Sequence, residues 1–280
     1  MTIHGLRQQY PLELLLDLVK IPRSSFYYHT KNNAASEKYK DAERQIRQVY
    51  HQHKGRFGYR RITLAIRKMG SSLNHKTVFK LMRSMKLKSL IRSKRYRSYR
   101  GQTGKLVPNI LNRNFKSEKP IKKWATDVSE FRVGDKKLFL SPIIDLFNGE
   151  IISYDLSESA NFKQVTNMLT KAFRKVNKPQ NLVLHSDQGW QYQMKKYQQI
   201  LAAKGITQSM SRKGNCLDNA IIENFFGTIK SELFYLKKYS NIDELKKEIC
   251  EYIHYYNNER IRLNLNGMSP VHYRTHQTNR

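Results

Sequence analysis

The sequence has 280 residues, enough for about two domains, and its 39% hydrophobic content can form a sizeable core. Its formal net charge of +30 makes nucleic acid the first partner to consider, because a polyanion would neutralise the repulsion among these charges. No apolar run approaches the roughly 20 residues of a membrane span, and two cysteines provide neither a disulfide framework nor a zinc site. The N-terminus lacks the pattern of a secretory signal, which predicts a cytoplasmic protein without membrane partners.

Residues 1–95 are predicted to be a helical region. Apolar residues recur at helical spacing near the N-terminus, at Leu12, Leu15, Leu16 and Val19. Pro22 ends this helix, and the next helix is expected to run from about Ser36 to His53.

Two short helices then flank a turn at Gly70–Leu73. The apolar faces of these helices are formed by Ile62, Ile66 and Met69 and by Val78, Leu81, Met82 and Met85. Asn74 is the expected N-cap of the second helix. This arrangement suits a helix-turn-helix, a geometry that many proteins without DNA-binding activity share. The charge favours DNA binding, since residues 1–120 hold 28 basic and 6 acidic residues.

Residues 96–117 are predicted to be a basic linker. Between Lys86 and Lys105 there are eight basic residues and no acidic one, and tyrosines alternate with arginines in SKRYRSYRG. Arginine can pair with phosphate and tyrosine can stack on bases, whereas the alternative is a solvated charged linker. The candidate DNA contacts of the helical region and the linker are Arg60, Arg61, Lys76, Arg95 and Arg97.

Residues 118–278 have the pattern of an α/β domain. Three strands are predicted to meander, with Asn148-Gly149 as the hairpin turn before the third. Pro142 suggests an edge strand or a bulge. A helix, a strand, a helix ended by Gly205, a strand, and a helix with Asp218 as its N-cap follow. This order is that of an RNase H-like domain, so we expect an RNase H-like α/β core preceded by an all-α helix-turn-helix region.

Three acidic residues are the candidate catalytic groups of this domain. Asp127 lies in a strand, where a charge is costly unless it is paired or binds a metal. Asp187 directly follows the apolar strand LVL, and Glu223 lies at the edge of a helix stripe formed by Ile222 and its apolar neighbours. Each could also be an ordinary residue: a strand-edge charge, a turn residue or a solvated helix position.

Converging carboxylates repel one another, and divalent cations that prefer oxygen ligands remove that repulsion. Two such ions about 4 Å apart can activate an attacking oxygen and stabilise the leaving oxygen of a phosphodiester. That is the chemistry of cleaving and joining DNA strands. Spacing alone proves little, since 22 acidic residues give many chance pairs, and the flanking residues decide between these interpretations.

The strings around these residues resemble those of one family. WATDVSEF, LHSDQGWQY, CLDNAIIENFFGTIKSE and YYNNERIRLNLNGMSPVHYR follow one another as in the "insertion sequence three" family of bacterial transposases, and 35 residues separate Asp187 from Glu223. Upstream, FGYRRITLAI and NHKTVFKLM resemble the helix-turn-helix of that family's second reading frame. The resemblance covers nearly the whole chain.

The resemblance implies a transposase with a retroviral-integrase-type core. Asp127, Asp187 and Glu223 would be the metal-binding catalytic triad, with two Mg²⁺ ions, or Mn²⁺ in their place. Lys230 would contact the transposon end. Asn219 would bind DNA or the triad, with a structural role at the helix start as the alternative. His185 would position the site, and Asp145 is a weaker candidate for a supporting role. The implied phosphate contacts are Arg212, Lys213, Arg260 and Arg262.

The implied partners are the inverted-repeat ends of the element and its target DNA, bound by a homo-multimer associated with the bacterial nucleoid. Transposases of this family are often fusions with an upstream reading frame that carries a coiled coil, and this chain has no leucine-heptad run. Two alternatives therefore remain. The chain could be a non-catalytic DNA-binding regulator or an inactive partial product of a frameshift fusion. A nuclease acting on RNA–DNA hybrids fits the basic first region poorly.

Overall fold

The computed structural model describes residues 3–28, 39–90, 107–176, 179, 181–212 and 216–278. The chain divides into two compact units, residues 1–89 and 90–280. The expected linker at 96–117 lies partly outside the described residues, so its boundaries stay a prediction. Among the described residues, no helix is long and apolar enough to cross a membrane.

The first unit is helical, as the sequence predicts. It contains α1 (Ile3–Leu6), α2 (Leu12–Leu18), α4 (Lys40–Gln52), α5 (Tyr59–Lys68) and α6 (His75–Ser84). Helices α4, α5 and α6 bury a shared set of apolar side chains, which includes Ile46, Val49, Ile62, Ile66, Val78 and Met82.

Local sequence explains the ends of α5 and α6. Gly70 has a φ of +92°, a left-handed conformation that suits glycine and ends α5 in a turn. Asn74 caps α6 as predicted, since its side chain accepts a hydrogen bond from the backbone N–H of Lys76 at 2.9 Å. Met69 was expected on the apolar face of α5, but it is 45% exposed because the helix ends at Lys68.

The second unit contains a six-stranded mixed sheet. Its strands are β1 (Lys123–Thr126), β2 (Ser129–Val133), β3 (Lys136–Asp145), β4 (Ile151–Ser157), β5 (Val183–Ser186) and β6 (Thr207–Met210). Strand β3 is antiparallel to β1, β2 and β4, whereas β5 runs parallel to both β1 and β6. The order along the chain is the one predicted for an RNase H-like domain.

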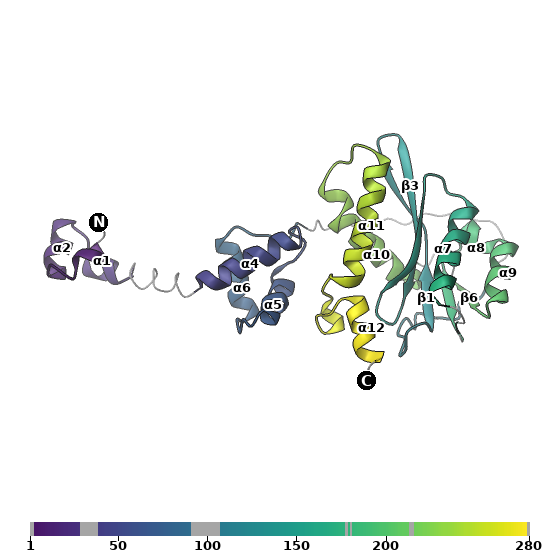
Figure 1. Ribbon diagram of the computed structural model, residues 1–280, viewed down its shortest axis with the longest axis horizontal. Coiled ribbons are helices and arrows are strands. Elements are labelled where there is room, and N and C mark those ends of the chain that lie inside the picture. The colour runs from purple at the N-terminus through teal and green to yellow at the C-terminus, as the bar shows by residue number, and fades with distance from the viewer. Residues whose placement is uncertain are drawn as a thin grey trace. The chain divides into compact units, whose positions relative to one another are not determined.

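Helices cover both faces of this sheet (Figure 1). One face carries α7 (Phe162–Lys175), α8 (Trp190–Gln193) and α9 (Lys195–Ala203). The other carries α10 (Ala220–Glu232), α11 (Ile242–Asn258) and α12 (Pro270–Thr278). The core on the α7 side is continuous through buried Trp124, Met168, Tyr192, Tyr197 and Leu201.

Strands β1 and β2 are two halves of one strand. The same antiparallel register against β3 runs through both halves, which places Asp127 and Val128 opposite Pro142 and Ser141. Pro142 has no N–H to donate, so the ladder is interrupted there. Pro142 lies in a central strand and not at an edge, and the predicted bulge is found next to it, in the β3–β4 pairing at Ile143/Ile144.

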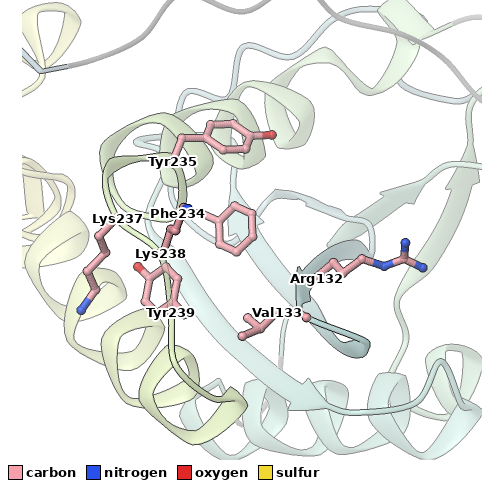
Figure 2. Close-up of a pocket in the computed structure, with 8 residues that line it drawn as sticks. Arg132, Val133, Phe234, Tyr235, Lys237, Lys238 and Tyr239 are labelled. Atoms are coloured by element: carbon pink, nitrogen blue, oxygen red, sulfur yellow. The ribbon is translucent and has the colours of Figure 1, made fainter.

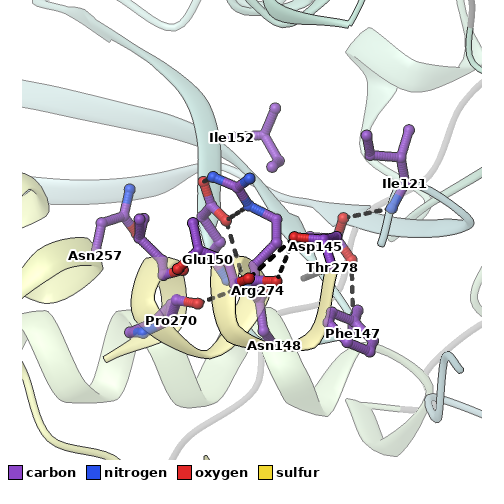
Figure 3. Close-up of polar contacts among 12 residues, drawn as sticks. Ile121, Asp145, Phe147, Asn148, Glu150, Ile152, Asn257, Pro270, Arg274 and Thr278 are labelled. Atoms are coloured by element: carbon purple, nitrogen blue, oxygen red, sulfur yellow. Dashed lines mark hydrogen bonds and ion pairs between the residues drawn. The ribbon is translucent and has the colours of Figure 1, made fainter. Parts of the chain in front are cut away.

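Buried polar contacts hold α12 against the β3–β4 turn (Figure 3). Arg274 on α12 donates to Glu150 at 2.7 and 3.3 Å, and Asn148 donates to the Pro270 carbonyl at 2.8 Å. Asp145, only 1% exposed, accepts from the backbone N–H groups of Ile121 and Phe147. Burial raises the pKa of the Asp145 carboxyl.

Candidate active site

Asp127 and Asp187 lie at the ends of two adjacent parallel strands. Thr126, the last residue of β1, is the register partner of Ser186, the last residue of β5. The next residue of each strand is an aspartate, so the fold brings the two carboxylates to the same edge of the sheet. The carboxyl ends of parallel strands are the usual place for a site in such sheets.

Backbone N–H groups orient both aspartates. The Asp127 carboxylate accepts from Val128 at 2.7 Å, within the interruption between β1 and β2. The Asp187 carboxylate accepts from Gly189 at 2.8 Å, in the turn before α8. A Cβ at Gly189 would lie 2.9 Å from the Asp187 Oδ1 atom and 2.6 Å from the Gln191 Nε2 atom. A side chain at position 189 would therefore displace the Gln191 amide and the Asp187 carboxylate.

Glu223 is brought to these aspartates by α10. It lies in the first turn of that helix, which packs against β1. Burial raises the pKa of Asp127 well above its usual range, and the charges of Asp187 and Glu223 raise it further. Lys230, seven residues after Glu223 on α10, acts on Asp127 in the opposite direction. All three carboxylates and Lys230 therefore share one electrostatic environment.

The pKa of Asp187 is also raised, by burial. Among the described residues, no three His, Cys, Asp or Glu side chains form a ready-made metal cluster. The charges of Asp187 and Glu223 each oppose ionisation of Asp127, so repulsion is centred on Asp127. A cation has the charge needed to offset that repulsion.

His185 connects the Asp187 strand to the start of α10. Its ring is fully buried, and Nε2 donates to the Asp218 carbonyl at 2.8 Å while Nδ1 accepts from the Ser209 hydroxyl at 2.9 Å. Burial lowers the pKa of this imidazole, which keeps it neutral. These contacts fit a positioning residue, the role expected for His185.

Asp218 is not the N-cap of α10, contrary to expectation. A 3₁₀ turn (Cys216–Asn219) precedes the helix, and the Asp218 carboxylate is buried in an ion cluster with distant residues. It accepts from Arg212 at 2.8 and 2.9 Å, from Arg113 at 3.0 Å and from Asn109 at 2.9 Å. Arg212 and Arg113 hold the pKa of Asp218 far below its usual range. This cluster fixes the start of the Glu223 helix.

Three further residues that the sequence predicted for the site have different surroundings from those expected. Arg260 is not an exposed phosphate contact, because it is 7% exposed and bound to Glu232. Asp145 pairs with Trp124 at the start of β1, the opposite end from Asp127, so it does not support the triad. Arg212 is paired with Asp218, although half of its side chain is exposed.

The remaining candidates are placed as follows. Asn219 is 4% exposed at the start of α10, and its side chain has no hydrogen-bond partner among the residues that the structure describes. Arg262 donates to the Asn148 carbonyl at 3.0 Å. Arg60 and Arg61 lie in the first turn of α5, where their guanidinium groups contact the rings of Tyr59 and Phe57. Exposed Lys76 is in the first turn of α6. Lys213, Arg95 and Arg97 lie outside the described residues.

One residue near the carboxylates was missed by sequence reasoning. The Tyr192 side chain is fully buried, and burial raises the pKa of its hydroxyl, with further contributions from Asp127 and Asp187. Its place three residues after Gly189, within the string LHSDQGWQY, was the available signal.

Comparison with known proteins agrees with this architecture. The model of the integrase core domain matches residues 117–216, a second integrase core model matches 223–277, and the model of an HTH-like domain matches 37–95.

Two relatives are transposases of Escherichia coli (strain K12). The chain is 56% identical to a protein named as transposase InsK for insertion sequence element IS150, over 98% of this chain and 96% of that protein. It is 26% identical to transposase InsF for insertion sequence IS3A, over 95% of this chain and 94% of that protein. A structure of the HTLV-2 integrase catalytic core domain in complex with magnesium is 18% identical, with a TM-score of 0.46 over 56% of this chain and 98% of that chain. The chain therefore belongs to the insertion sequence three family of transposases, with an integrase catalytic core that follows an HTH-like domain.

Proposed function

We propose that Asp127, Asp187 and Glu223 form the metal-binding triad that cuts and joins the ends of this insertion sequence. The observation that carries the proposal is that Asp127 and Asp187 lie at one sheet edge and that the charges of Asp187 and of Glu223, on α10, both act on Asp127. Lys230 supplies one positive charge against three negative ones, so the donor set suits a divalent cation with oxygen preference. Mg²⁺ is the proposed ion, two per site, with Mn²⁺ as a substitute.

Each part of the site has a role in this proposal. Bound divalent ions would supply Lewis-acid activation of the attacking oxygen and stabilisation of the leaving oxygen. The backbone N–H groups of Val128 and Gly189 hold the aspartates in fixed orientations, and α10 carries Glu223, whose charge acts on Asp127. Lys230 would pair with a phosphate of the strand that enters the site. Water as the attacking group gives cleavage, and a DNA 3′-hydroxyl gives strand transfer.

The first unit would bind DNA through its basic surface. Arg60, Arg61, Lys76 and Arg95 of the helical region and Arg97 of the linker are proposed phosphate contacts, with the inverted-repeat ends as the ligand. Arg212, Lys213 and Asn219 would act near the cut. Two ends must be brought together, so the active form is proposed to be a homo-multimer. Each neutralised phosphate releases counterions, which predicts an affinity that falls steeply with salt.

The test is a cleavage assay with a labelled DNA fragment that carries an end of the element, with and without Mg²⁺. Asp127→Asn, Asp187→Asn and Glu223→Gln should each abolish Mg²⁺-dependent cleavage and keep DNA affinity within about threefold. Glu251→Gln is the matched control, because Glu251 is an exposed acidic residue of α11. Cleavage retained by any one of the three variants removes that residue from the mechanism.

A second outcome concerns the wild type. If it binds the end but cuts only when fused to an upstream reading frame, the triad proposal stands and the isolated chain is a partial product. If it binds the end and neither form cuts with Mg²⁺ or Mn²⁺, the non-catalytic regulator is correct.

A further inference from the structure

A cavity of about 410 Å³ opens between the tip of the β2–β3 hairpin and the segment that follows α10 (Figure 2). Arg132 and Gly134 line it from the hairpin, and Phe234, Tyr235, Lys238 and Tyr239 line it from the other side. We call this cavity the aromatic pocket. Its volume suits a single small ligand and excludes a DNA duplex.

Aromatic rings form one wall of the aromatic pocket. Phe234 and Tyr239 are nearly parallel, with ring centroids 5.8 Å apart and an interplanar angle of 10°. Phe131 of β2 meets Phe234 edge-on at 5.2 Å. Tyr235 is 40% exposed, although a large aromatic side chain usually gains free energy by burial. Such surfaces suit the flat face of a nucleobase, and stacking on them tolerates any base.

The aromatic pocket also has positive charge available for a phosphate. Lys237 is already bound to Glu244 and Glu248. Arg132 and Lys238 are exposed, and within the described part of the chain they form no ion pair. An aromatic wall beside two uncompensated cations is the combination that binds single-stranded nucleic acid.

The aromatic pocket is linked by direct contacts to the candidate active site. The Lys230 Nζ atom lies 5.1 Å from the centre of the Phe131 ring, and Phe131 packs against Phe234 of the pocket. Lys230 is also the cation whose charge acts on Asp127. A strand held at the carboxylates would therefore have the aromatic pocket beside it, on the far side of Phe131.

We propose that the aromatic pocket binds one unpaired nucleotide of the DNA end that enters the active site, with its base against Tyr235 and Phe234 and its phosphate between Arg132 and Lys238. This inference rests on the proposed function. It adds that the enzyme recognises a frayed or single-stranded nucleotide next to the cut and favours such ends over blunt ones.

The test compares two DNA ends of the same sequence, one blunt and one with a short single-stranded overhang, in buffer without divalent metal. 2-Aminopurine is placed at one overhang position at a time, and its fluorescence reports stacking. Other basic surfaces contribute equally to both dissociation constants, so their contribution cancels in the ratio. The wild type should prefer the overhang by about 5- to 150-fold, the range expected for one stacked base, and should quench 2-aminopurine at one position.

Variants identify the source of that preference. Tyr235→Ala should bring the ratio near one and remove the quench, Tyr235→Trp should restore both, and Arg132→Ala should reduce the ratio. Arg174→Ala is the matched control, because Arg174 is an exposed arginine on α7 and should change neither quantity. Unchanged melting temperatures show that the exposed substitutions leave the fold intact.

Three results would overturn the proposal: a wild type with no preference, a Tyr235→Ala variant that keeps the preference, or equal effects of Arg132→Ala and Arg174→Ala. Because no metal is present, failure of the proposed cleavage chemistry would leave these measurements unaffected. Conversely, a Tyr235→Ala variant that binds both ends like the wild type refutes only the proposal that the aromatic pocket binds a nucleotide. The triad proposal would stand if Mg²⁺-dependent cleavage still depends on the three carboxylates.

Discussion

Arg260 is the charged residue whose two possible roles, a buried ion pair or a phosphate contact, are most easily distinguished by experiment. Sequence reasoning made it a phosphate contact, whereas the structure places it in a buried pair with Glu232, the last residue of the Glu223 helix. Its Nε and terminal nitrogen donate to the two Glu232 oxygens at 2.8 and 2.7 Å. Tyr252 donates a third hydrogen bond to the same carboxylate at 2.9 Å.

Arg260→Met should be strongly destabilising, because it leaves Glu232, 1% exposed, without its counter-charge. Breaking a buried pair in this way costs about 3–5 kcal/mol. In a unit of this size, 1 kcal/mol shifts the melting temperature by roughly 2–4 °C, so the expected loss is about 6–20 °C. The double variant Glu232→Leu/Arg260→Met should recover most of it, since no unpaired charge remains.

Thermal unfolding followed by circular dichroism, together with DNA binding at low temperature, checks this prediction. DNA affinity and its salt dependence should be unchanged in folded Arg260→Met protein. A stability loss below about 1 kcal/mol, with a salt slope reduced by about one, would instead make Arg260 a phosphate contact and refute the buried-pair assignment.

Three other predictions concern the site and the first unit. Gly189→Ala should weaken Mg²⁺-dependent cleavage while DNA affinity stays constant, because the new Cβ would crowd the Asp187 carboxylate; wild-type cleavage would refute the close approach. Asp127→Asn should stabilise the metal-free protein, because the folded state raises the pKa of that carboxyl and ionising it opposes folding. In denaturation at several pH values this gain over the wild type should be full at pH above the raised pKa and shrink as the pH falls through the raised pKa toward the ordinary value, below which the wild-type carboxyl is protonated in the folded and unfolded states alike; a gain that grows on acidification would contradict this reasoning. Asn74→Ala should cost the first unit about 1 kcal/mol in urea denaturation, whereas no loss would show that the cap of α6 is dispensable.

The order of strands and helices could be predicted because its signals are local. Apolar strand segments, the Asn148-Gly149 turn and the helix end at Gly205 each depend on residues within a few positions of one another. The position of Asp187 followed from the same signals, since it comes directly after an apolar strand. Asp127 was expected within a strand, whereas it lies in the interruption between β1 and β2.

Contacts between distant residues could not be predicted in this way. Aspartate just before a helix is typical of an N-cap, but the carboxylate of Asp218 pairs with Arg113, which lies 105 residues away in the sequence. Arg260 lies in a polar sequence segment typical of the surface, but it pairs with Glu232, which lies 28 residues earlier at the end of α10. In both cases a buried counter-charge decides the role of the residue, and only the fold shows which charges meet.

The central claim is that Asp127, Asp187 and Glu223 bind divalent metal together, and a Mn²⁺ titration followed by electron paramagnetic resonance tests it without requiring turnover. The wild type should bind Mn²⁺ saturably in the presence of a DNA end. Binding should be markedly weaker in Asp127→Asn, Asp187→Asn and Glu223→Gln, and unchanged in Glu251→Gln. Equal Mn²⁺ binding by the wild type and all four variants would contradict the claim.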